Sequence, residues 1–126
     1  MSWLRAVAFD SIGTCLSLEP LRPRLVGLGL QASDLELWFA RSLRDGFACE
    51  CAGRFLEFKI VLASTLRSLL IERGLPDDQR RIDAVVDGFS ELPVHPDVAA
   101  AFELVREAGL KLAILTNGSA QATRQA

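Results

Sequence analysis

Two short apolar runs, one near each end of the chain, most strongly constrain what this sequence can fold into. The first covers residues 6–9 and stops abruptly at Asp10, and the second covers residues 111–115 and stops at Thr116 and Asn117. A short apolar run bounded by polar and glycine residues is typical of a strand that is buried on both faces of a sheet. We therefore expect two buried strands, each followed by a polar loop.

The residues between the two runs have a helical period. From residue 33 to residue 73, apolar side chains recur at spacings of three and four, and Gly74 follows at a position typical of a helix C-cap. Another helix is expected to start near residues 77–78, because acidic side chains stabilise a helix N-terminus. A further amphipathic helix, residues 97–108, leads directly into the second apolar run.

This order of elements predicts an α/β protein with a parallel sheet, because a helix that returns directly into an apolar strand is half of a β-α-β unit. We expect residues 1–15 and 93–126 to form the α/β core and residues 16–92 to pack as an inserted helical bundle. Residues 119–126 are expected to begin a helix. Because two strands alone make a poor sheet, we expect the core to be incomplete and the chain to be part of a larger protein.

Composition and charge exclude several classes of protein. The chain has 126 residues, with 14 basic and 16 acidic side chains, so its charge gives no case for binding nucleic acid or an anionic membrane. It has no apolar run close to the ~20 residues that cross a bilayer and no signal-peptide pattern. Cys15, Cys49 and Cys51 fit neither a disulfide framework nor a zinc pair, which favours reduced thiols in a cytoplasmic protein.

Asp10 is the strongest candidate for chemistry. A carboxylate at the carboxyl end of a buried strand lies where open α/β sheets bind ligands, and it can act as a nucleophile. We expect it to be buried beneath the helical insert, with the N–H groups of residues 11–14 available to an anion. Thr116 and Asn117 would end the second strand at the same edge and hold a substrate oxygen. The structural alternative is that these polar residues cap turns or helices.

Both strand ends resemble the first two motifs of the haloacid dehalogenase superfamily. Residues 7–16, VAFDSIGTCL, are similar to an apolar strand followed by D-x-x-G-T-L, and residues 112–119, LAILTNGS, to an apolar strand followed by Ser or Thr, Asn and Gly. The resemblance covers essentially the whole chain and implies a Rossmann-like core with a helical cap. It also implies that Asp10 is the catalytic nucleophile and that Thr116 and Asn117 bind the substrate.

Within this resemblance, position 12 separates the branches of the superfamily. Phosphatases typically carry a second Asp two residues after the nucleophile, whereas the side chain of Ile12 cannot exchange a proton. The resemblance therefore favours the 2-haloacid dehalogenase (type II) branch. In that branch Asp10 displaces halide from a 2-haloalkanoic acid, and hydrolysis of the ester gives the 2-hydroxy acid without a cofactor. The alternative is a phosphatase that would need Mg²⁺, held by Asp10 and the Ile12 carbonyl.

Two departures from the family pattern leave a further alternative, a truncated and non-catalytic remnant. The cap arginine of the dehalogenases falls on Phe39, and Arg41 stands two residues further on, about 200° around a helix. The superfamily's lysine and last acidic loop would follow the second motif, after the end of this sequence. As partners we expect a small-molecule 2-haloacid, no nucleic acid and no membrane, and we allow for a homodimer.

Overall fold

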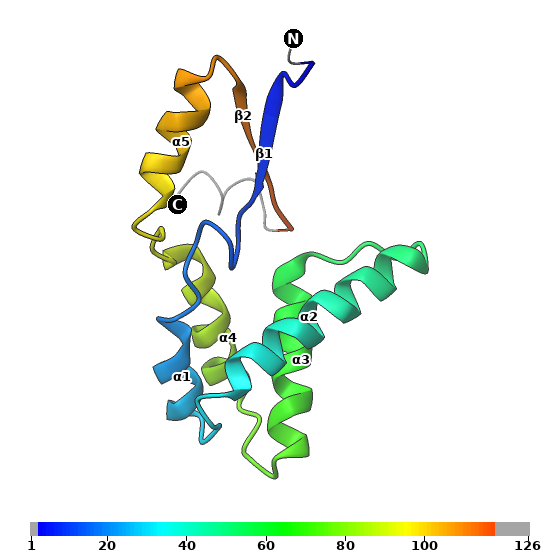
Figure 1. The fold of residues 1–126 in the computed structure, drawn as a ribbon. Helices are drawn as coiled ribbons and strands as arrows, with labels where there is room; N and C mark the ends of the chain where they lie inside the picture. The colour runs from blue at the N-terminus through cyan, green and yellow to red at the C-terminus, as the bar shows by residue number, and fades with distance from the viewer. Residues whose placement is uncertain (1–2, 118–126) are drawn as a thin grey trace.

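The structure is a computed structural model that describes residues 3–117 (Figure 1). In chain order its elements are β1 (Ala6–Asp10), α1 (Leu21–Gly27), α2 (Asp34–Cys51), α3 (Phe58–Glu72), α4 (Gln79–Asp87), the 3-10 helix η1 (Gly88–Glu91), α5 (Val98–Glu107) and β2 (Lys111–Leu115). The predicted α/β class is confirmed. The helix expected at residues 119–126 lies outside the described residues.

The two strands lie side by side and run in the same direction. Their register pairs Ala6 with Lys111 at one end and Asp10 with Leu115 at the other. Parallel neighbours end at the same edge of a sheet, and a connection through a helix is needed to bring the chain back to the start of the second strand. Helix α5 provides that connection and lies beside the sheet (Figure 1).

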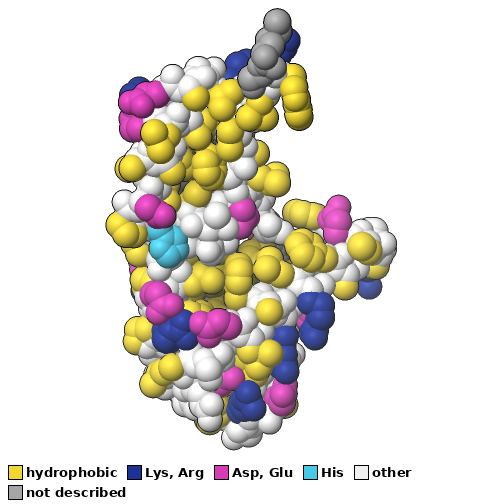
Figure 2. All heavy atoms as spheres, in the orientation of Figure 1, with side chains coloured by type: hydrophobic (Ala, Val, Ile, Leu, Met, Phe, Trp, Pro, Cys, Tyr) yellow, Lys and Arg dark blue, Asp and Glu magenta, His cyan; other side chains and the backbone are white. Residues whose placement is uncertain are grey.

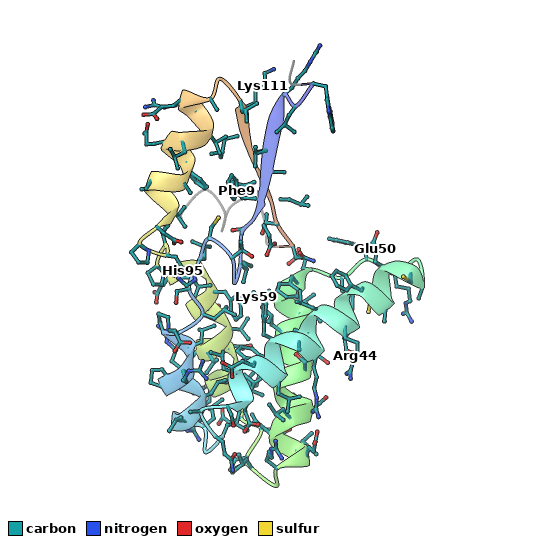
Figure 3. All side chains as sticks on the ribbon, viewed as in Figure 1. Phe9, Arg44, Glu50, Lys59, His95 and Lys111 are labelled. Carbon is teal, nitrogen blue, oxygen red and sulfur yellow. The ribbon has the colours of Figure 1, made fainter. Side chains whose placement is uncertain are left out.

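One face of the sheet packs against α5, and the other face is open in the part of the chain that the structure describes. Phe9 points from β1 toward α5 (Figure 3), and its ring centroid lies 5.1 Å from that of Phe102. The expectation that both strands are buried is wrong for these residues. Every residue of β2 is exposed, and β1 alternates between exposed and half-buried residues, because only one layer of helix covers the sheet between residues 3 and 117.

The helices α1 to α4 pack around an apolar core of their own, below the sheet in Figure 1. Trp38 of α2 is fully buried at its centre. Its indole N–H donates to the Leu62 carbonyl at 3.0 Å, and its ring meets Phe89 edge-on at a centroid distance of 5.6 Å. Buried aliphatic side chains belong to the same core: Leu21, Leu25, Leu35, Leu66, Leu69, Leu70 and Ile82.

Most helix ends agree with the sequence-based expectations. Helix α3 ends just before Gly74, whose φ of +68° suits a glycine C-cap. Asp78 caps α4 by accepting a hydrogen bond from the Arg81 N–H at 3.1 Å. The beginning of α3 differs from the expectation. The apolar spacing of this helix extends back to Phe55, but the helix begins at Phe58, and the Phe55 side chain is 79% exposed.

Helix α1 is the element that the sequence pattern did not predict. The composition of residues 22–24, Arg-Pro-Arg, is typical of a solvated turn, yet these residues lie in the first turn of this helix, where the missing N–H of proline costs little. Arg22 is held there by Glu19, at 2.7 Å, and by Glu36. Hydrogen bonds from Arg22 lower the pKa of both carboxyl groups. Arg22 is therefore a structural cation in this fold.

The two chain segments that join the helices to the α/β part are hydrogen-bonded to each other. The Ser17 N–H donates to the Pro93 carbonyl at 2.8 Å, and the His95 N–H donates to the Cys15 carbonyl at 2.9 Å. Residues far apart in the sequence thereby form a short two-chain bridge, closed by an antiparallel pairing of Leu16 with Val94. This bridge fixes where the helices stand relative to the end of β1.

The described residues also bear on two exclusions made from the sequence. No helix among residues 3–117 is long and apolar enough to cross a membrane. Cys15 is buried, Cys49 half-buried and Cys51 exposed, and all three are free thiols. That the thiols are reduced in the protein's own environment stays a prediction. The cytoplasmic location stays a prediction.

Candidate active site

A cleft of about 270 Å³ lies where the end of the sheet faces α2 and α3. Its lining combines the polar residues Asp10 and Asn117 with the apolar residues Ile12, Phe39, Leu43, Phe47 and Phe58. Figure 2 shows hydrophobic side chains gathered along the hollow between the sheet and the helices. The cleft therefore places one carboxylate and one carboxamide against a largely apolar wall.

Asp10 is the last residue of β1, so its side chain is carried by a paired strand. The Thr14 hydroxyl donates a hydrogen bond to Asp10 Oδ2 at 2.7 Å, which orients the carboxylate. The expectation that Asp10 is buried is wrong for the described residues, because Asp10 is exposed. The reason is the open face of the sheet: Leu115, its partner across the sheet, is 71% exposed as well.

The parallel register explains how the second strand reaches the same cleft. Because Asp10 is paired with Leu115, Thr116 and Asn117 follow at the same edge of the sheet. Asn117 lines the cleft together with Asp10. Thr116, the residue before Asn117, is half-buried. The structure thus brings Asp10 and Asn117 together as the sequence predicted. Gly118 and Ser119, whose N–H groups were expected to contribute, lie outside the described residues.

The loop after β1 differs from the expectation that its N–H groups are available to an anion. The Gly13 N–H donates to the Leu16 carbonyl at 3.0 Å, and the Thr14 N–H donates to the Ser11 carbonyl at 3.2 Å. The loop is therefore folded on itself, with Gly13 at a φ of +84°, a conformation that glycine adopts with little strain. Two of the four amides that were expected to bind an anion already have partners.

Helix α2 presents one face to its core and an adjacent face to the cleft. Leu35, Trp38 and Ser42 are buried in the core. Phe39, Leu43 and Phe47, each four residues apart, line the cleft instead, because a spacing of four keeps side chains on one side of a helix. In the family resemblance, Phe39 stands at the position of the cap arginine. The sequence does not single out Leu43, Phe47 and Phe58 as cleft residues, although the spacing of four from Phe39 is a usable signal for Leu43 and Phe47.

The arginines of α2 do not belong to this cleft. Arg41 donates to Glu72 of α3 at 2.6 Å. Arg44 lies on the side of α2 that is turned away from the sheet (Figure 3) and is paired with Asp45. The cleft residues that the structure describes include neither Lys nor Arg. This arrangement agrees with the offset of about 200° between Phe39 and Arg41 around the helix, which turns Arg41 away from the side that Phe39 occupies.

Cys15 lies close enough to Asp10 to feel its charge, and the environment of Cys15 favours the protonated thiol. Burial raises the pKa of Cys15, and the negative charges of Asp10 and Asp97 raise it further. A protonated thiol is a weak nucleophile. The Cys15 thiol is therefore poorly equipped to act as a nucleophile.

Comparison with known proteins supplies the class to which this fold and site belong. A family model described as a haloacid dehalogenase-like hydrolase matches residues 4–126, and the chain belongs to this family. It is 28% identical, over all of its length, to an (S)-2-haloacid dehalogenase of Pseudomonas sp. strain CBS-3, and 29% identical, over 92% of its length, to one of Burkholderia cepacia.

A solved structure agrees with these relatives. The L-2-haloacid dehalogenase of Xanthobacter autotrophicus superposes on 97% of this chain with a TM-score of 0.82 at 25% identity. The chain spans about half the length of the proteins it matches: 56% and 51% of the two relatives and 50% of the solved chain. The matched region includes both strand ends and all the helices between them.

Proposed function

We propose that this protein hydrolyses 2-haloalkanoic acids, with Asp10 as the nucleophile. One observation carries the proposal: a carboxylate at the end of a strand shares a cleft with Asn117 from the neighbouring strand, in a chain whose relatives are named 2-haloacid dehalogenases. The apolar side chain of Ile12 supports this reaction over phosphoryl transfer, because halide leaves as an anion and needs no acid at that position.

The reaction proceeds in two steps. One Asp10 oxygen attacks C2 of the substrate, the carbon–halogen bond breaks, and the halide leaves with the bonding electrons. Water then attacks the carbonyl carbon of the Asp10 ester. This step releases a proton and the 2-hydroxy acid, inverted at C2, and restores the carboxylate. No atom of the protein changes its oxidation state in these two steps, and the scheme uses no cofactor.

The neighbouring residues take supporting roles in this proposal. Asn117 and Thr116 hold the substrate carboxylate at the end of β2, and Thr14 keeps Asp10 oriented through its 2.7 Å hydrogen bond. The helices of residues 16–92 act as a cap, which brings the apolar side of α2 over the reacting carbon and raises the rate by positioning. That division into cap and core, and the homodimer, stay predictions.

Halide release tests the proposed function. With 2-chloropropionate, we expect chloride and 2-hydroxypropionate to appear in equal amounts, measured by a halide electrode and by chromatography. A phosphate ester is supplied to a parallel sample with Mg²⁺, and we expect no phosphate release. Phosphate release without chloride release would contradict the proposal in favour of the phosphatase alternative.

A further inference from the structure

We propose that the apolar wall of the cleft selects substrates by a hydrophobic group several carbons long on the reacting carbon. The apolar wall consists of Phe39, Leu43, Phe47 and Phe58. The proposal rests on the proposed function and makes it more specific: the preferred substrate is a 2-haloacid with an extended alkyl or aryl substituent. A substrate with only a methyl group would leave most of this wall uncovered.

The chemistry of the wall supports an apolar ligand. Each of its four side chains is aliphatic or aromatic, and the cations closest along α2 are occupied elsewhere, Arg41 by Glu72 and Arg44 by Asp45. An anionic group gains nothing from such a surface and loses its hydration there. The carboxylate of a bound 2-haloacid must therefore lie toward Asn117, which leaves the wall for the substituent on C2.

The wall is also built to keep its shape. Phe39 and Phe58 meet edge to face at a centroid distance of 6.4 Å. The Phe39 ring lies directly over Gly13 of the loop after β1, where even a Cβ atom would come within 3.4 Å of it. Phe39 therefore connects the helices to the loop that carries Asp10, and it holds the wall at a fixed place relative to the nucleophile.

The size and exposure of the site fit an extended group. The cleft measures about 270 Å³. This is about nine times the volume that one molecule occupies in liquid water. Phe47 lines the cleft and is 57% exposed. A substituent that reaches Phe47 would remove this aromatic surface from water, and each buried methylene then tightens binding about fourfold.

Binding of unreactive product acids tests the inference separately from the chemistry. We expect the chain to bind 2-hydroxyhexanoate at least about tenfold more tightly than 2-hydroxypropionate in titration calorimetry, since the two ligands differ by three methylenes. Phe47→Ala is expected to remove most of this preference, and because Phe47 is exposed, the variant should fold normally. Phe39→Ala should remove it as well. Phe55→Ala changes an exposed phenylalanine outside the cleft lining and should keep it.

The outcomes separate this inference from the proposed function. Halide release from 2-bromohexanoate and 2-bromopropionate at equal efficiency, with equal binding of the two product acids, would overturn the inference and leave the proposed function standing. Tighter binding of the longer acid without halide release from either substrate would support the apolar site and count against the proposed function. Loss of the preference in Phe55→Ala would also overturn the inference, because the preference would not arise in this cleft.

Discussion

Replacing Asp10 by asparagine is expected to lower the rate of halide release by at least about 10³-fold. The carboxamide oxygen carries no full negative charge and cannot form the ester, so the first step of the proposed reaction is lost. Asparagine keeps the size of the side chain and an oxygen that can accept the Thr14 hydrogen bond. The expected loss therefore comes from the chemistry and not from a changed loop.

The matched control for this variant is Asp83→Asn. Asp83 lies on α4 and accepts a hydrogen bond from Gln79 at 2.7 Å, away from the cleft lining. We expect this variant to retain the rate of the unchanged chain, as measured with the same halide electrode. If Asp10→Asn and Asp83→Asn had equal rates, Asp10 would not be the nucleophile.

Trp38→Ala is expected to lower the free energy of unfolding by about 3–5 kcal/mol. The substitution empties the centre of the helical core, where Trp38 is fully buried. It also leaves the Leu62 carbonyl without its 3.0 Å hydrogen bond from the indole and removes the edge-on contact with Phe89. Urea unfolding followed by circular dichroism measures this loss as a lower midpoint.

The chain contains its own control for this measurement, because it has a second tryptophan. Trp3 is 89% exposed, so Trp3→Ala should change the stability by no more than about 0.5 kcal/mol. Comparable losses in the two variants would mean that Trp38 does not lie at the centre of the core formed by α1 to α4.

The positions of the strands and of most helices could be predicted from the sequence, because each depends on a local pattern. The apolar run that stops at Asp10 and the run that stops before Thr116 became β1 and β2, with the bounds of the second as predicted. Their parallel pairing followed from the helix between Asp97 and the second strand. That pairing brought Asp10 and Asn117 into one cleft.

The features that failed to follow from the sequence depend on particular side-chain and backbone contacts that a residue pattern does not show. Helix α1 has a proline in its first turn and is stabilised by ion pairs from Arg22 to Glu19, three residues earlier, and to Glu36 of α2. Burial of Asp10 was inferred from the apolar strand before it, but the exposure of a strand depends on what covers the sheet. The N–H group of Gly13 was assigned to a ligand, although the carbonyl of Leu16, in the same loop, accepts it.

A single turnover in ¹⁸O-labelled water tests most directly the claim that the Asp10 carboxylate attacks the substrate. With the protein in excess over the 2-haloacid, the hydroxyl oxygen of the product should be unlabelled, because it comes from Asp10. Mass spectrometry of the digested protein should find one ¹⁸O in the peptide that carries Asp10. A product hydroxyl that carries ¹⁸O in the first turnover, with an unlabelled peptide, would mean that water attacks the substrate directly and would contradict the account.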